Sequence, residues 1–458
     1  MAQFTKLCVC VAVFFFAHTA IPSHGQEIYV RERIPPVLTF DHVEDFYNGR
    51  AVVAQIIDNT WQFAVIDSDG NFVIPFFPHN TRPHQIHFSE GLVPIPNEGL
   101  FGFYDLDGEQ VIDYLFLDAQ PFSEGLAPVR FAGWNQDQWG FINTAGEVVI
   151  PPAFDMTLGF SEGLAPVKQG QWQSGWGFVD TSGNMAIYPS FFQAFGFTDG
   201  FAIVSHVNDP LVEPPQIGII NRYGHVVAWF DFPFMIQEHI PPRISEGLVS
   251  AGVALDDGLI LFGFMDTTGN MAIPPIFERA HDFSQGRAAV GAIMDGEPHM
   301  GNELLGLIDR YGHVVVPHMY HSIGAFSQER APVLVRTTSN QLLWGFIDPY
   351  GNEVIAPAYA SVLPFSEGLA AVMIGGQEGT RAGFIDRYDY PVVPFRFDYV
   401  RNFSHGFAWV NLDGRWGILE IYTPSNRWRI AVGLVVATIS LAAFVGICIK
   451  RKKMSQKV

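Results

Sequence analysis

Apolar residues recur in a fixed order along this chain, about every 40 residues, and polar turns containing glycine separate them. In the clearest copy, Trp139–Asn143 alternates so that Trp139 and Phe141 share one face of a strand and the small Gly140 shares the other with Ile142. Because both faces are largely apolar, the pattern predicts a strand buried on both sides. Gly140 would let a neighbouring backbone or ring approach closely.

The segments around this strand predict a small antiparallel sheet. Phe122–Gly125 reads as a tight turn, because glycine permits positive φ, and Leu126–Val129 reads as a short strand. Asn143 and Gly146 fit a type I turn with a bulge, in which the side chain accepts from backbone amides two residues on. Val149–Pro152 is the expected return strand, and a further extended segment leads into the next turn. Each unit is therefore expected to contain about four strands.

Ten copies of the turn phrase divide the chain into ten units. They begin near Phe46, Phe88, Phe122, Phe160, Phe197, Ile244, Phe283, Phe326, Phe365 and Phe403. The first and last copies are imperfect, as expected for terminal repeats. The longest interval contains an irregular stretch, 231–243, which predicts a seam between two groups of five. One unit alone buries too few side chains to offset the entropy of ordering about 40 residues, so successive units must pack on one another.

The hairpin that closes with Asp-x-x-Gly recurs with the same spacing. Its first and last positions are Asp67/Gly70, Asp105/Gly108, Asn143/Gly146, Asp180/Gly183, Asn221/Gly224, Asp266/Gly269, Asp309/Gly312 and Asp348/Gly351. Asparagine replaces aspartate twice, which keeps the hydrogen bond and loses the charge. This exchange favours turn geometry over metal binding or catalysis.

Together these phrases resemble the WG-repeat family of bacterial proteins. The Trp-Gly pair itself is kept at Trp139, Trp176, Trp344 and Trp416, and the resemblance covers nearly the whole region between the two termini. It implies a β-rich repeat, but no known activity and no functional residues to carry over. The predicted fold is all-β: a tandem array of about ten blade-like antiparallel units. The array is either propeller-like, in two groups of five, or an open superhelix, and one C-terminal transmembrane helix follows it.

The two ends of the chain predict export and anchoring. Residues 1–25 carry one early cation, an apolar run and then small or polar residues, which is the layout of a signal peptide cleaved after Ala20 or Gly25; an uncleaved anchor is the alternative. The repeat ectodomain is assigned to 26–426, and 427–449 to a transmembrane helix with its interfacial flank. Residues 450–458 form a basic tail expected in the cytoplasm. The predicted location is therefore the plasma membrane, single-pass, with the repeats outside.

The charge and the cysteine content limit the kinds of partner and site that are expected. The two ends hold six cations and no acid, so the exported part, counted to Arg429, has a formal charge of −26 against −20 for the whole chain. Such a surface repels nucleic acid and suits solubility, divalent cations or a neutral or basic partner. The three cysteines lie at 8, 10 and 448, so the ectodomain has no disulfide and no cysteine-based metal site.

The carboxylates of the turn phrase are the first candidate for chemistry. They recur as Glu90, Glu124, Glu162, Glu246 and Glu367, which raises the possibility of a glycosidase pair. Because Asp199, Gln285, Gln328 and His405 occupy the same repeat position, a hydrogen-bond role in the turn or between repeats is favoured. Gly159–Gly163 matches a nucleophile-elbow pattern, but it is the turn phrase of the fourth unit preceded by a glycine.

Metal binding has two weaker candidates. Asp67/Asp69 and Asp105/Asp107 resemble fragments of calcium loops that lack the later acidic ligand. Two histidine triplets share one spacing, which would suit zinc only if loops brought their members together. The triplets are His79, His84 and His87, and His313, His318 and His321.

These features predict a protein that is not an enzyme and that uses no catalytic residue, metal or cofactor. We expect a cell-surface scaffold, anchored by one transmembrane helix, that binds an extracellular protein or polysaccharide and no nucleic acid. The alternative is specific recognition of carbohydrate or cell wall through aromatic hairpins, and a glycoside-acting enzyme is a more distant third.

Overall fold

In the computed structural model, the described part of the chain is 28–422 apart from 79–85, 132, 134–137, 170–174, 207–215, 231–243, 255–259, 293–303 and 377–378. Val30–Tyr422 form one compact unit. Every regular element of the described residues is a β-strand, which confirms the all-β prediction. The predicted signal peptide, transmembrane helix and tail, and the predicted seam at 231–243, lie outside the described residues. No described segment is a helix long and apolar enough to span a membrane.

The strands form eight antiparallel sheets. The first sheet contains β2 (His42–Val43), β3 (Arg50–Ile57), β4 (Thr60–Asp67) and β5 (Phe72–Pro78), and the second contains β6 (Leu92–Asn97), β7 (Leu100–Asp105), β8 (Gln110–Ala119), β9 (Leu126–Phe131), β10 (Trp139–Asn143) and β11 (Val148–Phe154). The third sheet contains β12 (Met156–Thr157), β13 (Leu164–Lys168), β14 (Trp176–Asp180) and β15 (Met185–Phe191), and the fourth contains β16 (Gln193–Ala194), β17 (Phe201–His206), β18 (Gln216–Asn221) and β19 (Val226–Phe230). The fifth sheet contains β20 (Leu248–Ala254), β21 (Ile260–Asp266), β22 (Met271–Ala280), β23 (Ala288–Ala292), β24 (Leu305–Ile308) and β25 (Val314–Tyr320).

The last three sheets complete the compact unit, and the final one includes the first strand of the chain. They contain β26 (Ser322–Ile323), β27 (Ala331–Arg336), β28 (Leu342–Ile347) and β29 (Glu353–Tyr359); β30 (Ser361–Val362), β31 (Leu369–Gly376), β32 (Gly379–Asp386) and β33 (Pro391–Phe397); and β34 (Tyr399–Val400), β35 (Phe407–Leu412), β36 (Arg415–Tyr422) and β1 (Tyr29–Leu38).

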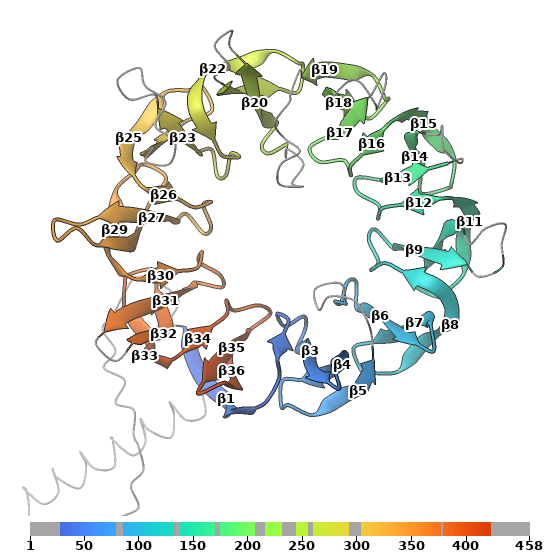
Figure 1. Ribbon diagram of the computed structural model, residues 1–458, viewed down its shortest axis with the longest axis horizontal. Helices are drawn as coiled ribbons and strands as arrows, with labels where there is room; N and C mark the ends of the chain where they lie inside the picture. The colour runs from blue at the N-terminus through green and yellow to red at the C-terminus, as the bar shows by residue number, and fades with distance from the viewer. Residues whose placement is uncertain are drawn as a thin grey trace, which may run out of the picture. The chain divides into compact units, whose positions relative to one another are not determined.

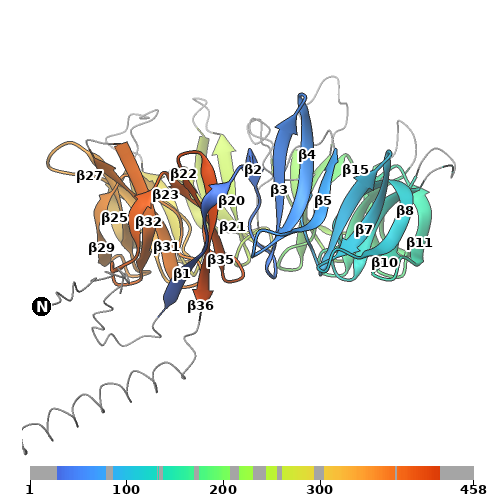
Figure 2. The ribbon, with the colours of Figure 1, turned by 90° about the horizontal axis from the view of Figure 1, so that it is seen from below.

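The sheets stand around one ring, with their strands running from one face of the ring to the other (Figures 1 and 2). This arrangement is a β-propeller of eight sheets that carries ten repeat units. Two sheets have six strands because β8 and β22 each pair on both sides and so join two units. The alternatives of two groups of five and of an open superhelix are wrong, because all ten units follow one another around a single ring.

The ring closes by pairing the two ends of the repeat region. Strand β1 lies beside β36 in the last sheet (Figure 1). Arg33 supports this pairing with bonds to Glu420 on β36 and Asp69 in the first unit. A hydroxyl bond from Ser404 Oγ to the carbonyl of Phe46, 2.8 Å long, links the tenth unit to the first. Closure therefore needs residues more than 350 positions apart in sequence.

The sheets begin slightly earlier than the sequence units. The two-residue strand β12 precedes the turn phrase at Phe160 and pairs with β13, at the edge of the sheet near the inside of the ring (Figure 1). The extended segment that follows the return strand of the third unit, Ala153–Met156, therefore ends within the first strand of the next sheet. Strand pairing thus couples consecutive units as well as packing does.

The glycine of the Trp-Gly pair allows two strands to approach closely, as the sequence predicts. A Cβ atom added at Gly177 would lie 2.5 Å from the carbonyl oxygen of Ile187 on the return strand. The pairing of β14 with β15 shifts register at this place. Only a residue without a side chain fits beside this bulge.

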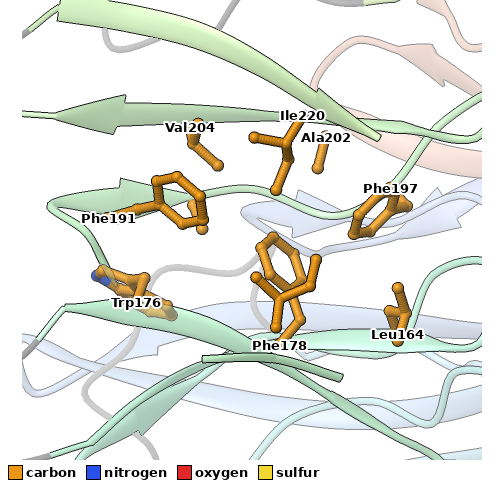
Figure 3. Close-up of a cluster of buried hydrophobic side chains, with 10 residues drawn as sticks. Leu164, Trp176, Phe178, Phe191, Phe197, Ala202, Val204 and Ile220 are labelled. Carbon is orange, nitrogen blue, oxygen red and sulfur yellow. The ribbon is translucent and has the colours of Figure 1, made fainter. Parts of the chain in front are cut away.

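The hydrophobic core lies between neighbouring sheets. Phe178 on β14 packs edge-on against Phe197 of the next turn phrase, with ring centroids 5.0 Å apart, and both rings are buried (Figure 3). Equivalent pairs recur around the ring at Phe103/Phe122, Phe141/Phe160, Phe264/Phe283, Phe346/Phe365 and Phe384/Phe403. The prediction that aromatic strands bury one another across successive units is confirmed.

Candidate functional site: the turns of the repeat

The turn phrase forms a two-residue hairpin loop, which we call the inner turn. In the third unit, Ser123 N donates to Leu126 O (2.9 Å) and Leu126 N donates to Ser123 O (3.2 Å). Both central residues, Glu124 and Gly125, have positive φ, which defines a type I′ turn. The residue at the glutamate position has φ between 47° and 54° in all ten units. The sequence predicted positive φ for the glycine but not for the residue before it.

The side chain at the glutamate position reaches the inner turn of the next unit. Glu124, for example, accepts from the amides of Glu162 (2.6 Å) and Gly163 (2.8 Å). Links of this kind join Glu90 to Gly125, Glu124 to Gly163, Glu162 to Gly200, Asp199 to Gly247, Glu246 to Gly286, Gln285 to Glu329, Gln328 to Gly368 and Glu367 to Gly406. The predicted inter-repeat hydrogen-bond role of these residues is confirmed.

The serine of the inner turn makes a parallel set of links. Its hydroxyl donates to the backbone carbonyl that opens the next turn phrase. The donors and acceptors are Ser89/Phe122, Ser123/Phe160, Ser161/Phe197, Ser245/Phe283, Ser284/Phe326, Ser327/Phe365, Ser366/Phe403 and Ser404/Phe46. Ser161, the central residue of the nucleophile-elbow pattern, is thus a structural donor in a β-hairpin and has no helix after it.

The first unit departs from both sets of links. Tyr47 replaces the serine and Asn48 replaces the glutamate, and neither makes the corresponding bond to the second unit. Instead, the Tyr47 ring stacks on Phe88 at 6.0 Å and lies 5.1 Å from the imidazole of His405. A cavity of about 210 Å³ opens here, lined by Glu44, Asp45, Phe46, Tyr47, Val52, His87, Phe88, Ser404 and His405.

The hairpin that closes with Asp-x-x-Gly, which we call the outer turn, has the predicted geometry. In the sixth unit, Asp266 Oδ1 accepts from Thr268 N (2.8 Å) and Asn270 N (3.0 Å), and Gly269 has φ +86°. The hydrogen bond from the Thr268 hydroxyl is the largest cause of the lowered pKa of Asp266. Burial opposes it, and backbone amides add to it. A ninth outer turn begins at Asp386 and is not predicted by the Asp-x-x-Gly pattern. Asp389 occupies the glycine position of this turn and has φ +68°.

Four outer turns present a tyrosine at the same position, two residues after the Asp or Asn. Tyr223, Tyr311, Tyr350 and Tyr388 are 80%, 81%, 74% and 52% exposed. Arginines beside two of them bond to inner turns: Arg222 Nη2 donates to Glu162 O (2.8 Å), and Arg310 Nη2 donates to Glu246 O (2.6 Å). Inner and outer turns therefore lie at the same face of the ring. The four tyrosines occupy one repeat position at this face in the fifth, seventh, eighth and ninth units, and we call them the aromatic row.

The metal candidates that the structure describes do not assemble into sites. Asp67 accepts from amides of its own outer turn, and Asp69 pairs with Arg33 at 2.8 Å. His313 lies 3.1 Å from Asp309 in an outer turn, whereas His318 is on β25, where burial lowers its pKa. His79 and His84 lie outside the described residues. Among the described residues, no group of three or more His, Cys, Asp or Glu side chains could hold a metal ion.

The closed ring of repeated sheets, joined turn to turn, is a repeat β-propeller, a class of fold that suits a binding or scaffold module. The chain belongs to the family described as "WG containing repeat". That family matches residues 101–133, 139–171, 176–209, 262–291, 306–336, 344–377 and 383–416, which together make up half of the chain. No curated protein matches the chain in sequence.

Several solved structures are similar to parts of the ring at 11% sequence identity. A eukaryotic initiation factor structure covers 72% of this chain and 92% of its own, with a TM-score of 0.42. The β-propeller domain of the Trilobed protease from Pyrococcus furiosus covers 69% and 99%, with a TM-score of 0.30. The uncharacterized protein lmo1340 from Listeria monocytogenes EGD-e covers 60% and 96%, also at 0.30. Similarity at this level carries no argument about function.

Proposed function

We propose that this protein is a non-catalytic binding scaffold held at the cell surface by one C-terminal transmembrane helix. The apolar, uncharged run Ile430–Ile449 and the cations at 450–453 support the anchor, and the layout of 1–25 supports export. The ring would then stand outside the membrane. Its acidic character disfavours nucleic acid, so the expected partner is an extracellular protein or polysaccharide.

The observation that carries the binding role is the exposed tyrosine row. Tyr223, Tyr311 and Tyr350 expose at least 74% of their surface at one repeat position, although most large aromatic residues of the repeat are core material. Asx-type hydrogen bonds hold each turn, so the rings are presented on rigid supports. Exposed tyrosines at one face are typical of a binding surface, because a flat ring gives a large contact area at a small entropic cost.

Carbohydrate recognition is the second candidate function. The exposed tyrosines, rather than the tryptophans, would contact the sugar. Trp176 is 9% exposed and Trp409 is fully buried, so neither can stack on a sugar, and Trp229, at 41%, is less exposed than Tyr223, Tyr311 or Tyr350. The phenol faces of the aromatic row are accessible and carry a hydroxyl for hydrogen bonding. A polysaccharide would stack on the tyrosines of the seventh, eighth and ninth units, which is how a repeated surface gains avidity.

The binding role is tested by removing the tyrosines together. The triple variant Tyr223→Ser, Tyr311→Ser and Tyr350→Ser should lose binding to glycan and cell-wall arrays by at least about tenfold relative to the parent chain. Tyr188→Ser is the matched control, because Tyr188 is 77% exposed but lies on the outer strand β15. Unchanged binding by the triple variant would refute the aromatic row as the binding surface, and a parent chain that binds nothing would leave a structural role only.

The location is tested separately from binding. One epitope tag is placed after Gly25 and another at the C-terminus of the full chain. Antibody should label the first tag on intact cells and the second only after permeabilisation. Labelling of both tags, or of neither, on intact cells would contradict the proposed topology.

A further inference from the structure

Arginines join inner turns to outer turns at four junctions between units. An arginine ends three inner turns (Arg50, Arg287 and Arg330), and an arginine follows the Asp or Asn of three outer turns (Arg222, Arg310 and Arg387). Where a junction has one arginine, it donates to a backbone carbonyl of the turn opposite. The pairs are Arg50/Leu106, Arg222/Glu162, Arg310/Glu246 and Arg287/Pro349, at 2.5–2.8 Å. Each acceptor is therefore a neutral amide oxygen.

The junction between the eighth and ninth units has arginine at both positions, and neither makes this link. The inner turn lies before β27 and the outer turn joins β32 to β33. Arg330 Nε is buried and has no hydrogen-bond partner among the described residues. By the pattern of the other outer-turn arginines, Arg387 Nη2 would donate to the carbonyl of Gln328. It lies instead 3.4 Å from the carboxylate of Glu329, which is a weak contact.

The charged groups of these two turns lie close together at the surface. Burial, and then the like charge of Arg387, lower the pKa of Arg330, whereas Asp348, Glu329 and Tyr388 raise it. The side chains of Arg387 and Glu329 are 47% and 72% exposed, so solvent reaches both. Tyr388 of the aromatic row follows Arg387 directly and is 52% exposed. An arginine without its usual link, a carboxylate and an aromatic ring are therefore accessible at one junction.

Glu329 is not required by the geometry of the repeat. It stands where the other nine inner turns have glycine, and its φ of +61° is unfavourable for a residue with a side chain. Its amide donates to Gln285 Oε1 at 3.0 Å, which glycine would do equally well. Within the described part of the chain, its carboxylate bonds to Arg387 alone. A strained residue that presents an exposed carboxylate favours a role in binding.

The charges of the two turns favour a neutral ligand. Their two arginines face three carboxylates, Glu329, Asp386 and Asp389, so the net formal charge is −1 and an anion is disfavoured. Asp386 accepts from amides of its own turn, and Asp389 accepts from the hydroxyl of Tyr359. The acceptor that Arg387 lacks is an amide carbonyl at the equivalent junctions. The acetamido group of a sugar supplies such a carbonyl, and its hydroxyls suit the carboxylate of Glu329.

We propose that the junction between the eighth and ninth units binds an N-acetylated sugar. The acetamido oxygen accepts from Arg387, a sugar hydroxyl donates to Glu329, and the sugar ring stacks on Tyr388. This inference rests on the proposed function, because it assigns a ligand class to one end of the aromatic row. The competing interpretation is that Arg387 and Glu329 form only a surface ion pair, which contributes little to stability or binding.

The first experiment compares two trisaccharides that differ at the acetamido position. Chitotriose, the trimer of N-acetylglucosamine, and cellotriose, the corresponding trimer of glucose, are titrated into the purified full-length chain by calorimetry. Chitotriose should bind at least about tenfold more tightly, as expected for one hydrogen bond to a charged donor. Equal affinities, or no binding of chitotriose, would overturn the proposal. The proposed function would still stand if the triple tyrosine variant lost binding to other glycans, so the two failures are distinguishable.

Two variants then separate binding from stability. Glu329→Gly restores the residue of the other nine inner turns, and Arg387→Gln removes the guanidinium. Each should weaken chitotriose binding by about tenfold without lowering Tm, and Arg387→Gln should bring the two trisaccharides within about twofold of each other. Arg222→Gln is the matched control, because Arg222 has the same repeat position but donates to Glu162 O; its chitotriose affinity should stay within about twofold of the parent chain.

The outcomes of the variants decide between the two interpretations. Unchanged chitotriose binding in Glu329→Gly or in Arg387→Gln would overturn the proposal. So would a loss of binding that is accompanied by a lower Tm, or an equal loss in Arg222→Gln, because either result would point to a structural effect.

Discussion

Packing between units can be measured at one aromatic pair. Phe178 and Phe197 come from successive units, both are buried, and their rings meet edge to face at 5.0 Å. Replacing either with leucine keeps an apolar side chain but removes three carbon atoms from the core, so each single change should lower the free energy of unfolding by about 1–2 kcal/mol. The edge-to-face geometry itself is worth about 0.5–1.5 kcal/mol beyond the buried area, and only a double-mutant cycle isolates it.

The assay is urea unfolding at 25 °C of Phe178→Leu, Phe197→Leu and the double variant. We expect a coupling energy of about 0.5–1.5 kcal/mol across the unit boundary. Phe141 and Phe178 occupy the same position in neighbouring units and make no ring contact with each other, so the Phe141→Leu, Phe178→Leu cycle should give coupling within about 0.5 kcal/mol of zero. Similar values for the two cycles, or a plateau in which one unit unfolds alone, would refute the reasoning that the units are stable only through their neighbours.

Three further predictions test the turns and the bulge. Gly177→Ala should destabilise the protein by about 1–3 kcal/mol in chemical unfolding, because the new Cβ would lie 2.5 Å from a backbone carbonyl oxygen. Gly159→Ala is the control: the nearest atom to its Cβ would be 3.6 Å away, so stability should change by less than about 0.5 kcal/mol. The hydrogen bonds that lower the pKa of Asp266 stabilise the folded protein fully when the pH is well above the ordinary value of 3.8, and this stability is lost as the pH falls through the lowered pKa. Asp266→Asn should therefore lose less stability than the parent chain when the pH is reduced below about 4 in an acid titration. An unchanged dependence of stability on pH would contradict the assignment. Glu124→Ala should lower stability by about 1 kcal/mol, the low end for two lost hydrogen bonds, because both bonds are exposed. Glu124→Gln should be nearly neutral, because glutamine makes the same link in two other units. A larger effect of glutamine than of alanine would be inconsistent with this role.

The local structure of each unit is predictable from its residues because short-range rules determine it. Alternation in Trp176–Asp180 predicts a strand buried on both faces, and that strand is β14. The Asp-x-x-Gly spacing predicts the outer turn, and the exchange of Glu124 for glutamine or histidine in other copies predicts a hydrogen-bond role rather than catalysis. The Asp-x-x-Gly spacing does not predict the outer turn at Asp386, because Asp389 stands where the pattern requires glycine.

The sequence by itself determined the repeat, its strands and turns, and the need for neighbours to share a core, since all of these follow from interactions within about 40 residues. Only the tertiary structure decided that ten units make one closed ring, because closure depends on a small rotation between units that accumulates around the ring and on pairing of β1 with β36. It also decided that the tyrosines share a face and that Tyr47 and Asn48 interrupt the turn links beside a cavity. Those features bring together side chains from different units, so no single copy of the motif contains them.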